Sequence, residues 1–370
     1  MLSRNFISGR ISFLDKVLSL DYFLIFLILL LGIISFFAMY STESGNFSYY
    51  TKSHIYRFSV FFLLFILLSF FKIQFWKKNS YIFYTFVLSL LICVYFFGVT
   101  SSGSKRWINL FIFNLQPSEL MKISLIVFLA RYYSKRPTHT VSKFTSLLIP
   151  LIALIIPVFL VLNQPDLGTA LLIAIGGLIV IWLAGVKIKY FMFSIVTLVC
   201  SLPLVIAFLK PYQKLRILTF LNPERDPLGA GYQIIQSKIA IGSGGFFGKG
   251  FLQGSQSYLD YLPEKHTDFI FTLFSEEFGF IGSVLLLVIY ILIIYKIISI
   301  GNSSKDNFAK LFCFGFAASF FVYVTVNMMM VLGLLPIVGA PLPVMSYGGS
   351  SMLSIMIGFA IVMSSKITKS

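Results

Sequence analysis

YFLIFLILLLGIISFFAMY, residues 22–40, is an unbroken apolar stretch without a charged side chain. Its length matches the roughly 20 residues that a helix needs to cross the hydrocarbon core of a bilayer. Nine further apolar stretches follow, at residues 55–71, 81–97, 117–133, 144–162, 169–183, 190–209, 268–298, 310–332 and 350–363. The sequence therefore predicts an all-α, polytopic membrane protein with about ten transmembrane helices.

The composition of the chain supports this fold class. Of the 370 residues, 58% are hydrophobic and only 11% are charged, whereas about 25% of residues are charged in soluble domains. The apolar stretches are continuous rather than alternating, which excludes a transmembrane β-barrel. Cys93, Cys200 and Cys313 each lie inside an apolar stretch, so neither a disulfide framework nor a metal cluster is expected. Without a linker or an internal repeat, residues 1–370 are expected to form a single domain.

Basic residues predict how the helices are oriented. The first stretch follows Arg4, Arg10 and Lys16 and lacks a cleavage site, so it is expected to be a retained span with a cytoplasmic N-terminus. Most of the 29 Lys and Arg residues fall in connections expected on the cytoplasmic side. An even number of spans places both termini there and makes residues 210–267 a large extracytoplasmic loop between spans 7 and 8. The net charge of +16 then reflects topology and contact with anionic lipid, and no nucleic-acid partner is expected.

Acidic residues show the opposite bias. Most of the 13 Asp and Glu residues fall on outer segments or on the outer parts of spans, namely Glu43, Glu119, Asp166, Glu224, Asp226, Asp260, Glu264, Asp268, Glu276 and Glu277. The chemistry of the protein is therefore expected at the outer face of the membrane.

Asp268 stands at the start of the eighth apolar stretch. Thr267 is the expected N-cap, and a structural role for Asp268 would be to complement the positive end of the helix dipole. Glu276 and Glu277 follow roughly 12 Å further along the helix, at 1.5 Å per residue. A pair of carboxylates inside the membrane zone favours a functional cavity.

Two more groups of polar residues flank outer turns. Glu119 and Lys122 are spaced to meet on one helix face, as either a structural ion pair or part of a ligand site. Trp107 is an expected interface anchor. Asp166 is either a helix cap or a site carboxylate, and no base lies near it in the sequence.

The long outer segment contributes cations and an irregular glycine-rich stretch. Arg216 and Lys238 could meet a lipid phosphate, or they could belong to a solvated basic face. Residues 232–239 are expected to form an interfacial amphipathic helix. The glycines that follow do not form a phosphate loop, because Ser243 and Gly250 occupy positions where that motif needs Gly and Ser or Thr.

Residues 335–351, LPIVGAPLPVMSYGGSS, contain three prolines that preclude a regular helix. An irregular outer segment is expected there, and irregular backbone at membrane depth is tolerated where it lines a cavity. His54 is expected to lie in a loop and is given no role.

Five motifs follow one another along the chain: QPSE at residues 116–119, NQPDLGT at 163–169, GYQIIQSKIAIGSGG at 231–245, HTDFIF at 266–271 and PLPVMSYGGS at 341–350. Together they resemble the SEDS family (shape, elongation, division and sporulation proteins), and its RodA branch more than its FtsW branch. The resemblance implies a peptidoglycan glycosyltransferase that polymerises lipid II at the outer face of the cell inner membrane. It also implies a class B penicillin-binding protein as partner, within the elongation machinery that maintains rod shape.

The resemblance further implies roles for single residues. In the family the Asp of the HTDF motif is catalytic, and that position is Asp268 here. Residues of the family's cavity fall on Glu119, Lys122 and Asp166. The chemistry of lipid II agrees with a single base, because the acceptor hydroxyl must lose a proton as it attacks the anomeric carbon.

The departing pyrophosphate gains negative charge and should be stabilised by a cation. Lys122, Arg216 and Lys238 are the candidates, and the sequence does not choose among them. Trp107 and His266 complete the expected substrate-binding residues. No cofactor is firmly expected; a divalent cation, Mg²⁺ or Mn²⁺, is the alternative, held by Glu119 or Asp166.

Two other functions remain open from the sequence. A lipid II flippase would also use charged residues in a cavity, although it should need them along a path through the bilayer. A membrane scaffold for a penicillin-binding protein would leave Glu276 and Glu277 without a purpose.

Overall fold

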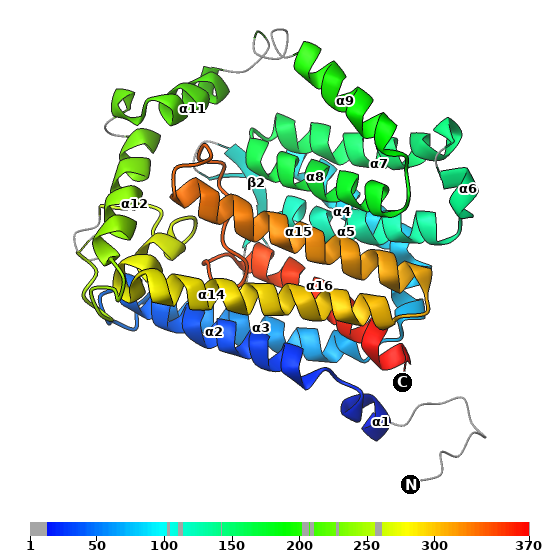
Figure 1. The fold of residues 1–370 in the computed structure, drawn as a ribbon, viewed down its shortest axis with the longest axis horizontal. Helices are drawn as coiled ribbons and strands as arrows, with labels where there is room; N and C mark the ends of the chain where they lie inside the picture. The colour runs from blue at the N-terminus through cyan, green and yellow to red at the C-terminus, as the bar shows by residue number, and fades with distance from the viewer. Residues whose placement is uncertain are drawn as a thin grey trace.

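The computed structural model describes residues 13–101, 104–109, 114–141, 143–201, 207, 211–226, 229–255 and 261–369. Long helices form a bundle in which most axes run side by side, and one small sheet lies among them (Figure 1). The all-α polytopic membrane fold predicted from the apolar stretches is confirmed. The assignment of all residues to a single domain stays a prediction.

Seven helices in the described residues are long and apolar enough to cross a membrane: α2 (Tyr22–Thr42), α3 (Tyr49–Ser69), α4 (Ile73–Phe97), α7 (Phe144–Asn163), α14 (Ile270–Ser303), α15 (Asn307–Val331) and α16 (Gly349–Lys369). Three more coincide with the other predicted spans. They are α5 (Pro117–Ser134), which contains charged side chains, and the shorter α8 (Leu167–Leu183) and α9 (Ile188–Cys200). The total of ten spans, and with it the location of the large loop, therefore stays a prediction.

Local capping chemistry explains where several helices begin. The carboxylate of Asp21 accepts a hydrogen bond from the Leu24 N–H at 3.0 Å at the start of α2, and Asp306 does the same for Phe308 at 2.9 Å at the start of α15. Such caps satisfy N–H groups that have no partner within the helix. Pro117 occupies the first turn of α5, where its missing N–H costs nothing.

A small sheet was not expected in an all-α chain. Strands β1 (Val99–Ser101), β2 (Ser104–Asn109) and β3 (Asn114–Leu115) pair antiparallel in the order β1-β2-β3. The strands are too short to leave a clear alternating pattern in the sequence. They form the connection between α4 and α5 and so bring β2 next to the start of α5.

Helix α14 differs from its prediction in two ways. It begins at Ile270 with Phe269 as N-cap, so the predicted cap at Thr267 is wrong and Asp268 lies in the preceding turn. It is also broken at Gly279, where φ is +64° and ψ is −161°. That conformation is open almost only to glycine.

The glycine-rich segment after α12 (Ala230–Gly244) fills the break in α14. The N–H groups of Phe280 and Ile281 donate to the carbonyl oxygens of Gly245 and Phe246 at 2.9 and 3.2 Å. In the other direction, the backbone N–H of Lys249 donates to the backbone carbonyl oxygen of Glu276 at 3.0 Å. The backbone groups freed by the break are thus paired inside the protein, as a low-dielectric surrounding requires.

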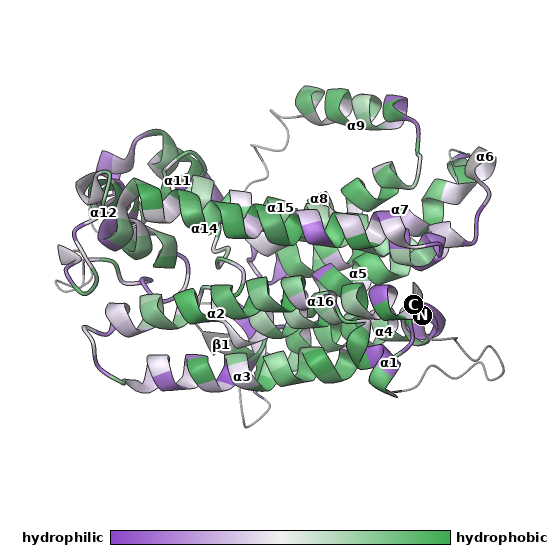
Figure 2. Ribbon diagram, turned by 60° about the horizontal axis from the view of Figure 1, so that its bottom comes forward, coloured by the Kyte–Doolittle hydropathy of each residue, from purple (hydrophilic) through white to green (hydrophobic). Residues whose placement is uncertain are grey.

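The two ends of the bundle carry different elements. The short helix α1 (Phe13–Leu18) and the end of α16 lie at one end, whereas α12 and the start of α14 lie at the other (Figure 1). Between the ends the ribbon is predominantly apolar (Figure 2). Large apolar side chains such as Phe26, Leu63 and Leu285 are more than half exposed there, which suits a surface covered by lipid rather than by water.

The described part of the long outer segment contains α11 (Pro211–Leu221), the 3₁₀ turn η1 (Pro223–Arg225) and α12. The helix predicted at residues 232–239 is present in α12, which packs on α14 and buries Ile234, Ser237 and Ala240, whereas its interfacial position stays a prediction. Asp260 and part of the predicted span at residues 190–209 lie outside the described residues.

Candidate functional site

Asp268 lies in a turn, residues 263–269, that a side-chain amide joins to the segment before α16. Nδ2 of Asn327, in α15, donates to the carbonyl oxygen of Asp268 at 2.9 Å and to that of Ala340 at 2.6 Å. Gly339 also lies close, because a Cβ built on it would come within 3.6 Å of Oδ2 of Asp268. The turn and the proline-containing segment before α16 are therefore fixed relative to each other.

Two further hydrogen bonds join these two segments. Oγ of Ser346 donates to the carbonyl oxygen of Thr267 at 2.5 Å, and the N–H of Tyr347 donates to that of His266 at 2.8 Å. The motifs at residues 266–271 and 341–350 thus form one unit, although they are distant in the sequence. The predicted irregular segment between α15 and α16 is confirmed.

The surroundings of Asp268 change its acidity. Removal from water, and then the charges of Glu264 and Asp166, raise the pKa of Asp268 to about 7, against the opposing effect of Arg216 and Arg106. The residue as a whole is half-buried. A carboxylate with a pKa near neutrality can accept and release a proton at physiological pH.

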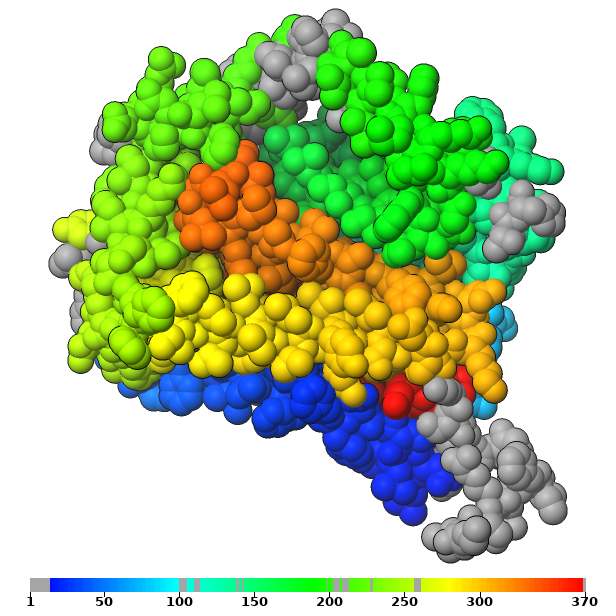
Figure 3. Space-filling model, viewed as in Figure 1, coloured from blue at the N-terminus to red at the C-terminus, as the bar shows by residue number. Residues whose placement is uncertain are grey.

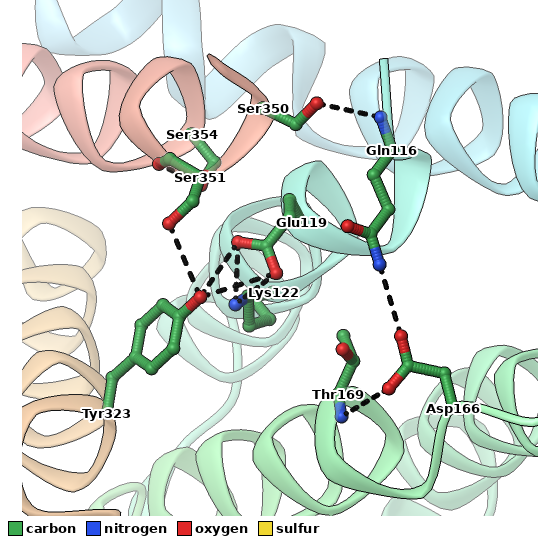
Figure 4. Close-up of polar contacts among 9 residues, drawn as sticks. All are labelled: Gln116, Glu119, Lys122, Asp166, Thr169, Tyr323, Ser350, Ser351 and Ser354. Carbon is green, nitrogen blue, oxygen red and sulfur yellow. Dashed lines mark hydrogen bonds and ion pairs between the residues drawn. The ribbon is translucent and has the colours of Figure 1, made fainter. Parts of the chain in front are cut away.

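Glu119 and Lys122 form a buried pair on α5. Nζ of Lys122 lies 2.8 Å from Oε2 of Glu119 and 3.7 Å from the centre of the Tyr323 ring. The hydroxyl of Tyr323 donates to Oε2 of Glu119 at 3.2 Å, and it lies 3.3 Å from Oγ of Ser351 (Figure 4). The pair predicted from i, i+3 spacing is present, with a tyrosine from α15 covering it.

Asp166 is both a helix cap and part of a polar network. Its Oδ1 accepts from the Thr169 N–H at 3.1 Å, and its Oδ2 accepts from Nε2 of Gln116 at 3.1 Å (Figure 4). Arg106 lies 3.5 Å from the same Oδ2. A basic side chain is therefore close to Asp166 in the structure, although none is near it in the sequence. Strand β2, which was not predicted, places it there.

The QPSE motif connects this network to the start of α16. The N–H of Gln116 donates to Oγ of Ser350 at 2.8 Å, and that hydroxyl donates to the carbonyl oxygen of Asn114 at 3.1 Å. Four of the five sequence motifs thereby meet at one end of the bundle. The fifth, in α12, packs on the first half of α14.

Three other predicted substrate-binding residues lie in α11, α12 and β2. Arg216, in α11, is near enough for its charge to act on Asp268. Lys238, in α12, is exposed, and its side chain lies against Gly333. A Cβ added to Gly333 would be 2.8 Å from Nζ of Lys238. Trp107 lies in β2 beside Arg106. The surface is hollowed between α9, α11 and the end of α15 (Figure 3).

His266 points toward α2 and α3. Its ring stacks on Tyr50 with centroids 4.4 Å apart, Nδ1 lies 3.1 Å from Oγ1 of Thr42, and Nε2 lies 3.0 Å from Oε1 of Glu43. These contacts tie the turn before α14 to the α2–α3 connection. The predicted role of His266 in substrate binding stays a prediction.

Glu276 and Glu277 are buried in the first half of α14 and have protein partners. Nζ of Lys249 lies 2.6 Å from Oε1 of Glu276, and Oγ of Ser255 donates to the same oxygen at 2.9 Å. Glu277 accepts a hydrogen bond from Oγ of Ser41 in α2. The pair therefore binds the glycine-rich segment and α2 to α14, which is a structural use for it.

No group of three or more His, Cys, Asp or Glu residues suited to a metal ion occurs in the described part of the chain. Glu119 is occupied by Lys122 and Tyr323, and Asp166 by Arg106, Gln116 and a helix N–H. The two carboxylates proposed to hold Mg²⁺ or Mn²⁺ therefore do not fit that ion in this arrangement.

Several residues of this site were not found from the sequence. Tyr323 and Asn327 lie in α15, and Ser350 and Ser351 begin α16. Asn327 had a usable signal, because an amide within a membrane-spanning stretch is costly unless it is hydrogen-bonded inside the protein. Tyr323 had none, since tyrosine is common in such helices.

The sequence matches the cell cycle protein family of FtsW, RodA and SpoVE over residues 17–370. The peptidoglycan glycosyltransferase MrdB of Escherichia coli strain K12 is 45% identical over 282 residues, which cover 76% of each chain. These matches confirm the family resemblance that the five motifs indicated.

Solved structures agree with the sequence comparison. A chain of a peptidoglycan synthase complex, described for its structural coordination of polymerization and crosslinking, has a TM-score of 0.78 at 32% identity and covers 94% of this chain and 97% of its own. The rod shape determining protein RodA of Thermus thermophilus has a TM-score of 0.71 at 26% identity, covering 94% of this chain and 96% of its own.

Proposed function

The chain belongs to the FtsW, RodA and SpoVE family of cell cycle proteins, and from this premise we propose that it is a peptidoglycan glycosyltransferase that polymerises lipid II. One observation carries the proposal: Asp268, with a pKa of about 7, stands in a clamped turn at the end of the bundle where four of the sequence motifs meet. Such a carboxylate suits the single proton transfer that this reaction needs.

In the proposed reaction, Asp268 is the general base. It takes the proton from the acceptor sugar hydroxyl, whose oxygen forms a bond to the anomeric carbon of the donor. The bond from that carbon to the pyrophosphate oxygen breaks, and the pyrophosphate leaves with the electron pair. No second carboxylate is needed, because pyrophosphate is already a good leaving group.

The negative charge that develops on the leaving group calls for a nearby cation. Lys122 is buried between Glu119 and Tyr323 and is therefore a poor candidate. Arg216 is partly exposed and acts on Asp268 through its charge. We propose that Arg216 stabilises the charge on the departing pyrophosphate and that the exposed Lys238 contacts the lipid phosphate.

The polyprenyl tails of the substrate need apolar grooves between helices. A groove of about 430 Å³ lies between α2 and α14 and is lined only by apolar residues, among them Phe37, Phe274 and Phe278. Phe274 stands less than two turns after the Asp268 turn. The groove therefore suits a chain whose head group lies at the outer end of the bundle.

Because Glu119 and Asp166 are engaged by basic side chains, any Mg²⁺ or Mn²⁺ would enter with the pyrophosphate of the substrate. Loss of polymerisation in EDTA, restored by Mg²⁺ or Mn²⁺, would support that entry. Unchanged polymerisation in EDTA would oppose it.

We also propose the cell inner membrane as location and a class B penicillin-binding protein as partner, within the elongation machinery. The similarity to a chain of a synthase complex that joins polymerization and crosslinking supports the partner. The continuous exposed apolar surface of the bundle supports the membrane location.

The test uses the protein purified with its penicillin-binding partner, supplied with fluorescent lipid II and analysed for glycan strands on a gel. Asp268→Asn should abolish polymer, whereas Glu224→Gln, an exposed carboxylate in η1, should not. Full polymer from Asp268→Asn would refute the assignment. Scrambling of lipid II across liposomes without polymer would favour the flippase, and neither activity would favour the scaffold.

A further inference from the structure

The buried hydroxyl of Ser35, in α2, contacts three groups from distant parts of the chain. Its Oγ lies 2.5 Å from Nε2 of His54 in α3, and it donates toward the carbonyl oxygens of Val344 and Met345 at 3.1 and 3.0 Å. Ser35 is completely buried and His54 is 2% exposed. His54 was expected in a loop, and that expectation is wrong, because α3 begins six positions earlier than the predicted span.

The direction of these hydrogen bonds follows from the number of hydrogens. A serine hydroxyl has one hydrogen, and here it is directed at the carbonyl oxygens. Nε2 of His54 must therefore carry the hydrogen that is donated to Oγ of Ser35. Nδ1 is then the bare acceptor, which agrees with its having no hydrogen-bond partner in the described part of the chain.

The backbone that Ser35 contacts is strained. Val344 has a φ of +67°, a left-handed conformation that is an outlier for a β-branched residue. Such conformations persist only where surrounding contacts fix them, and they gather at functional sites. The hydroxyl of Tyr290 adds a hydrogen bond to the neighbouring carbonyl oxygen of Pro343 at 2.7 Å.

The strained residue stands two positions before the residue that contacts the Asp268 turn. Oγ of Ser346 donates to the carbonyl oxygen of Thr267 at 2.5 Å and accepts from the N–H of Leu342 at 2.7 Å. If Val344 relaxed to an ordinary conformation, the chain direction would change and Ser346 would move away from Thr267. The conformation of Val344 therefore bears on where Asp268 stands.

We infer that Ser35 and His54 are positioning residues of the glycosyltransferase: they hold Val344 in its left-handed conformation so that Ser346 fixes the turn that presents Asp268. His54 acts through Ser35, since its hydrogen bond leaves the hydroxyl hydrogen of Ser35 free for the two carbonyl groups. The inference rests on the proposed role of Asp268.

The first test compares the polymerisation rates of variants, each purified with the penicillin-binding partner. Ser35→Ala should lower kcat on the order of 10- to 100-fold, the loss that a displacement of about 1 Å causes, with KM for lipid II nearly unchanged. His54→Gln keeps a donor near the position of Nε2 and should retain more activity than His54→Met, which has none. Ser89→Ala, at an exposed serine in α4, is the matched control. Full activity of Ser35→Ala would overturn the inference.

The second test asks whether a glycine at position 344 makes the hydrogen bonds from Ser35 unnecessary. Glycine adopts positive φ without strain, so Ser35→Ala combined with Val344→Gly should recover most of the lost kcat. The same background with Val344→Ala removes similar side-chain atoms but keeps the strain, and it should remain impaired. Equal activity of the two double variants would overturn the inference, because Ser35 would then act only through packing.

A third measurement does not depend on catalysis. Amide hydrogen exchange of residues 342 and 344–347 should be faster in Ser35→Ala and restored to the wild-type rate by Val344→Gly. If exchange changes in this way but the Asp268→Asn variant is active, the proposed base is refuted and the positioning role of Ser35 stands. If exchange is unchanged in Ser35→Ala, the positioning role of Ser35 is refuted and the proposed base is unaffected.

Discussion

Asn327 donates a hydrogen bond of 2.9 Å from its amide to the carbonyl oxygen of Asp268, from within a mainly apolar helix, α15. The same Nδ2 reaches the carbonyl oxygen of Ala340 at 2.6 Å. One buried amide therefore joins the Asp268 turn, α15 and the irregular segment before α16. Its position inside the bundle makes the link a property of the fold rather than of the solvent-facing loops.

The first prediction concerns this amide. Asn327→Leu keeps the branched shape, in a somewhat larger side chain, but leaves the carbonyl oxygens of Asp268 and Ala340 without this donor, each at a cost of about 1–3 kcal/mol where the oxygen is buried. The thermal unfolding midpoint should fall, and polymerisation should fall on the order of 10- to 100-fold, because the Asp268 turn is no longer fixed. Thr325→Val, a half-buried change in the same helix, should affect both far less. Equal losses in the two variants would argue against the link.

The second prediction concerns pH. A general base works in its deprotonated form, so with a pKa of about 7 for Asp268 the polymerisation rate should rise as pH increases through 7 and level off above 8. Below pH 7 the rate should fall about tenfold per unit as the carboxyl is protonated. The measurement is a pH profile of kcat/KM with lipid II. A rate already constant from pH 5.5 upward would contradict a base with this pKa.

Neighbouring charges should move that profile in opposite directions. Glu264 raises the pKa of Asp268 and Arg216 lowers it, so Glu264→Gln should shift the midpoint to lower pH and Arg216→Gln to higher pH, each by less than about one unit. Lys214→Gln, exposed on the same helix as Arg216, is the control. A shift of the same sign in both variants would mean that the midpoint belongs to another group.

The position of Asp268 could be predicted from the sequence only in part. The HTDF motif located the residue and the apolar stretch located the helix, but the helix was expected to begin at Asp268 with Thr267 as its N-cap. The carbonyl oxygens of residues 266–268 are taken up by Tyr347, Ser346 and Asn327. These partners lie about 60 to 80 positions away, and periodicity within one stretch does not reveal such pairings.

The polar residues inside the bundle were the least predictable. His54 stood next to an apolar stretch and was assigned to a loop, because nothing local showed that Ser35 would contact it. Glu276 and Glu277 looked like cavity residues until the glycine-rich segment supplied Lys249 as a partner. In both cases the missing information was a long-range contact, whereas helix positions followed from local hydropathy.

The third prediction decides between two interpretations of Glu119 and Lys122. If the pair is structural, Lys122→Met leaves a buried carboxylate uncompensated and should destabilise the protein by about 3–5 kcal/mol. Lys122→Met combined with Glu119→Gln should recover most of that loss. Thermal unfolding in detergent is the measurement. Lys77→Met breaks a pair with Asp306 whose side chains are 23% and 21% exposed, and it should cost less than about 1 kcal/mol.

Binding provides the other outcome for the same variants. If Lys122→Met unfolds at the wild-type temperature and has lost affinity for lipid II, the pair belongs to a ligand site and the structural interpretation fails. The covering ring of Tyr323, 3.7 Å from Nζ of Lys122, argues for a closed structural pair.

The last prediction concerns the break in α14. Gly279 has φ +64° and ψ −161°, a region that costs other residues about 1–3 kcal/mol. A Cβ on it would come within 2.3 Å of the Gly248 nitrogen, so Gly279→Ala should also displace the glycine-rich segment and the partners of Glu276. The unfolding temperature and the polymerisation rate should both fall. Gly242→Ala, whose Cβ would have no neighbour within 4 Å, should change neither, and a stable, active Gly279→Ala would show that α14 can run unbroken.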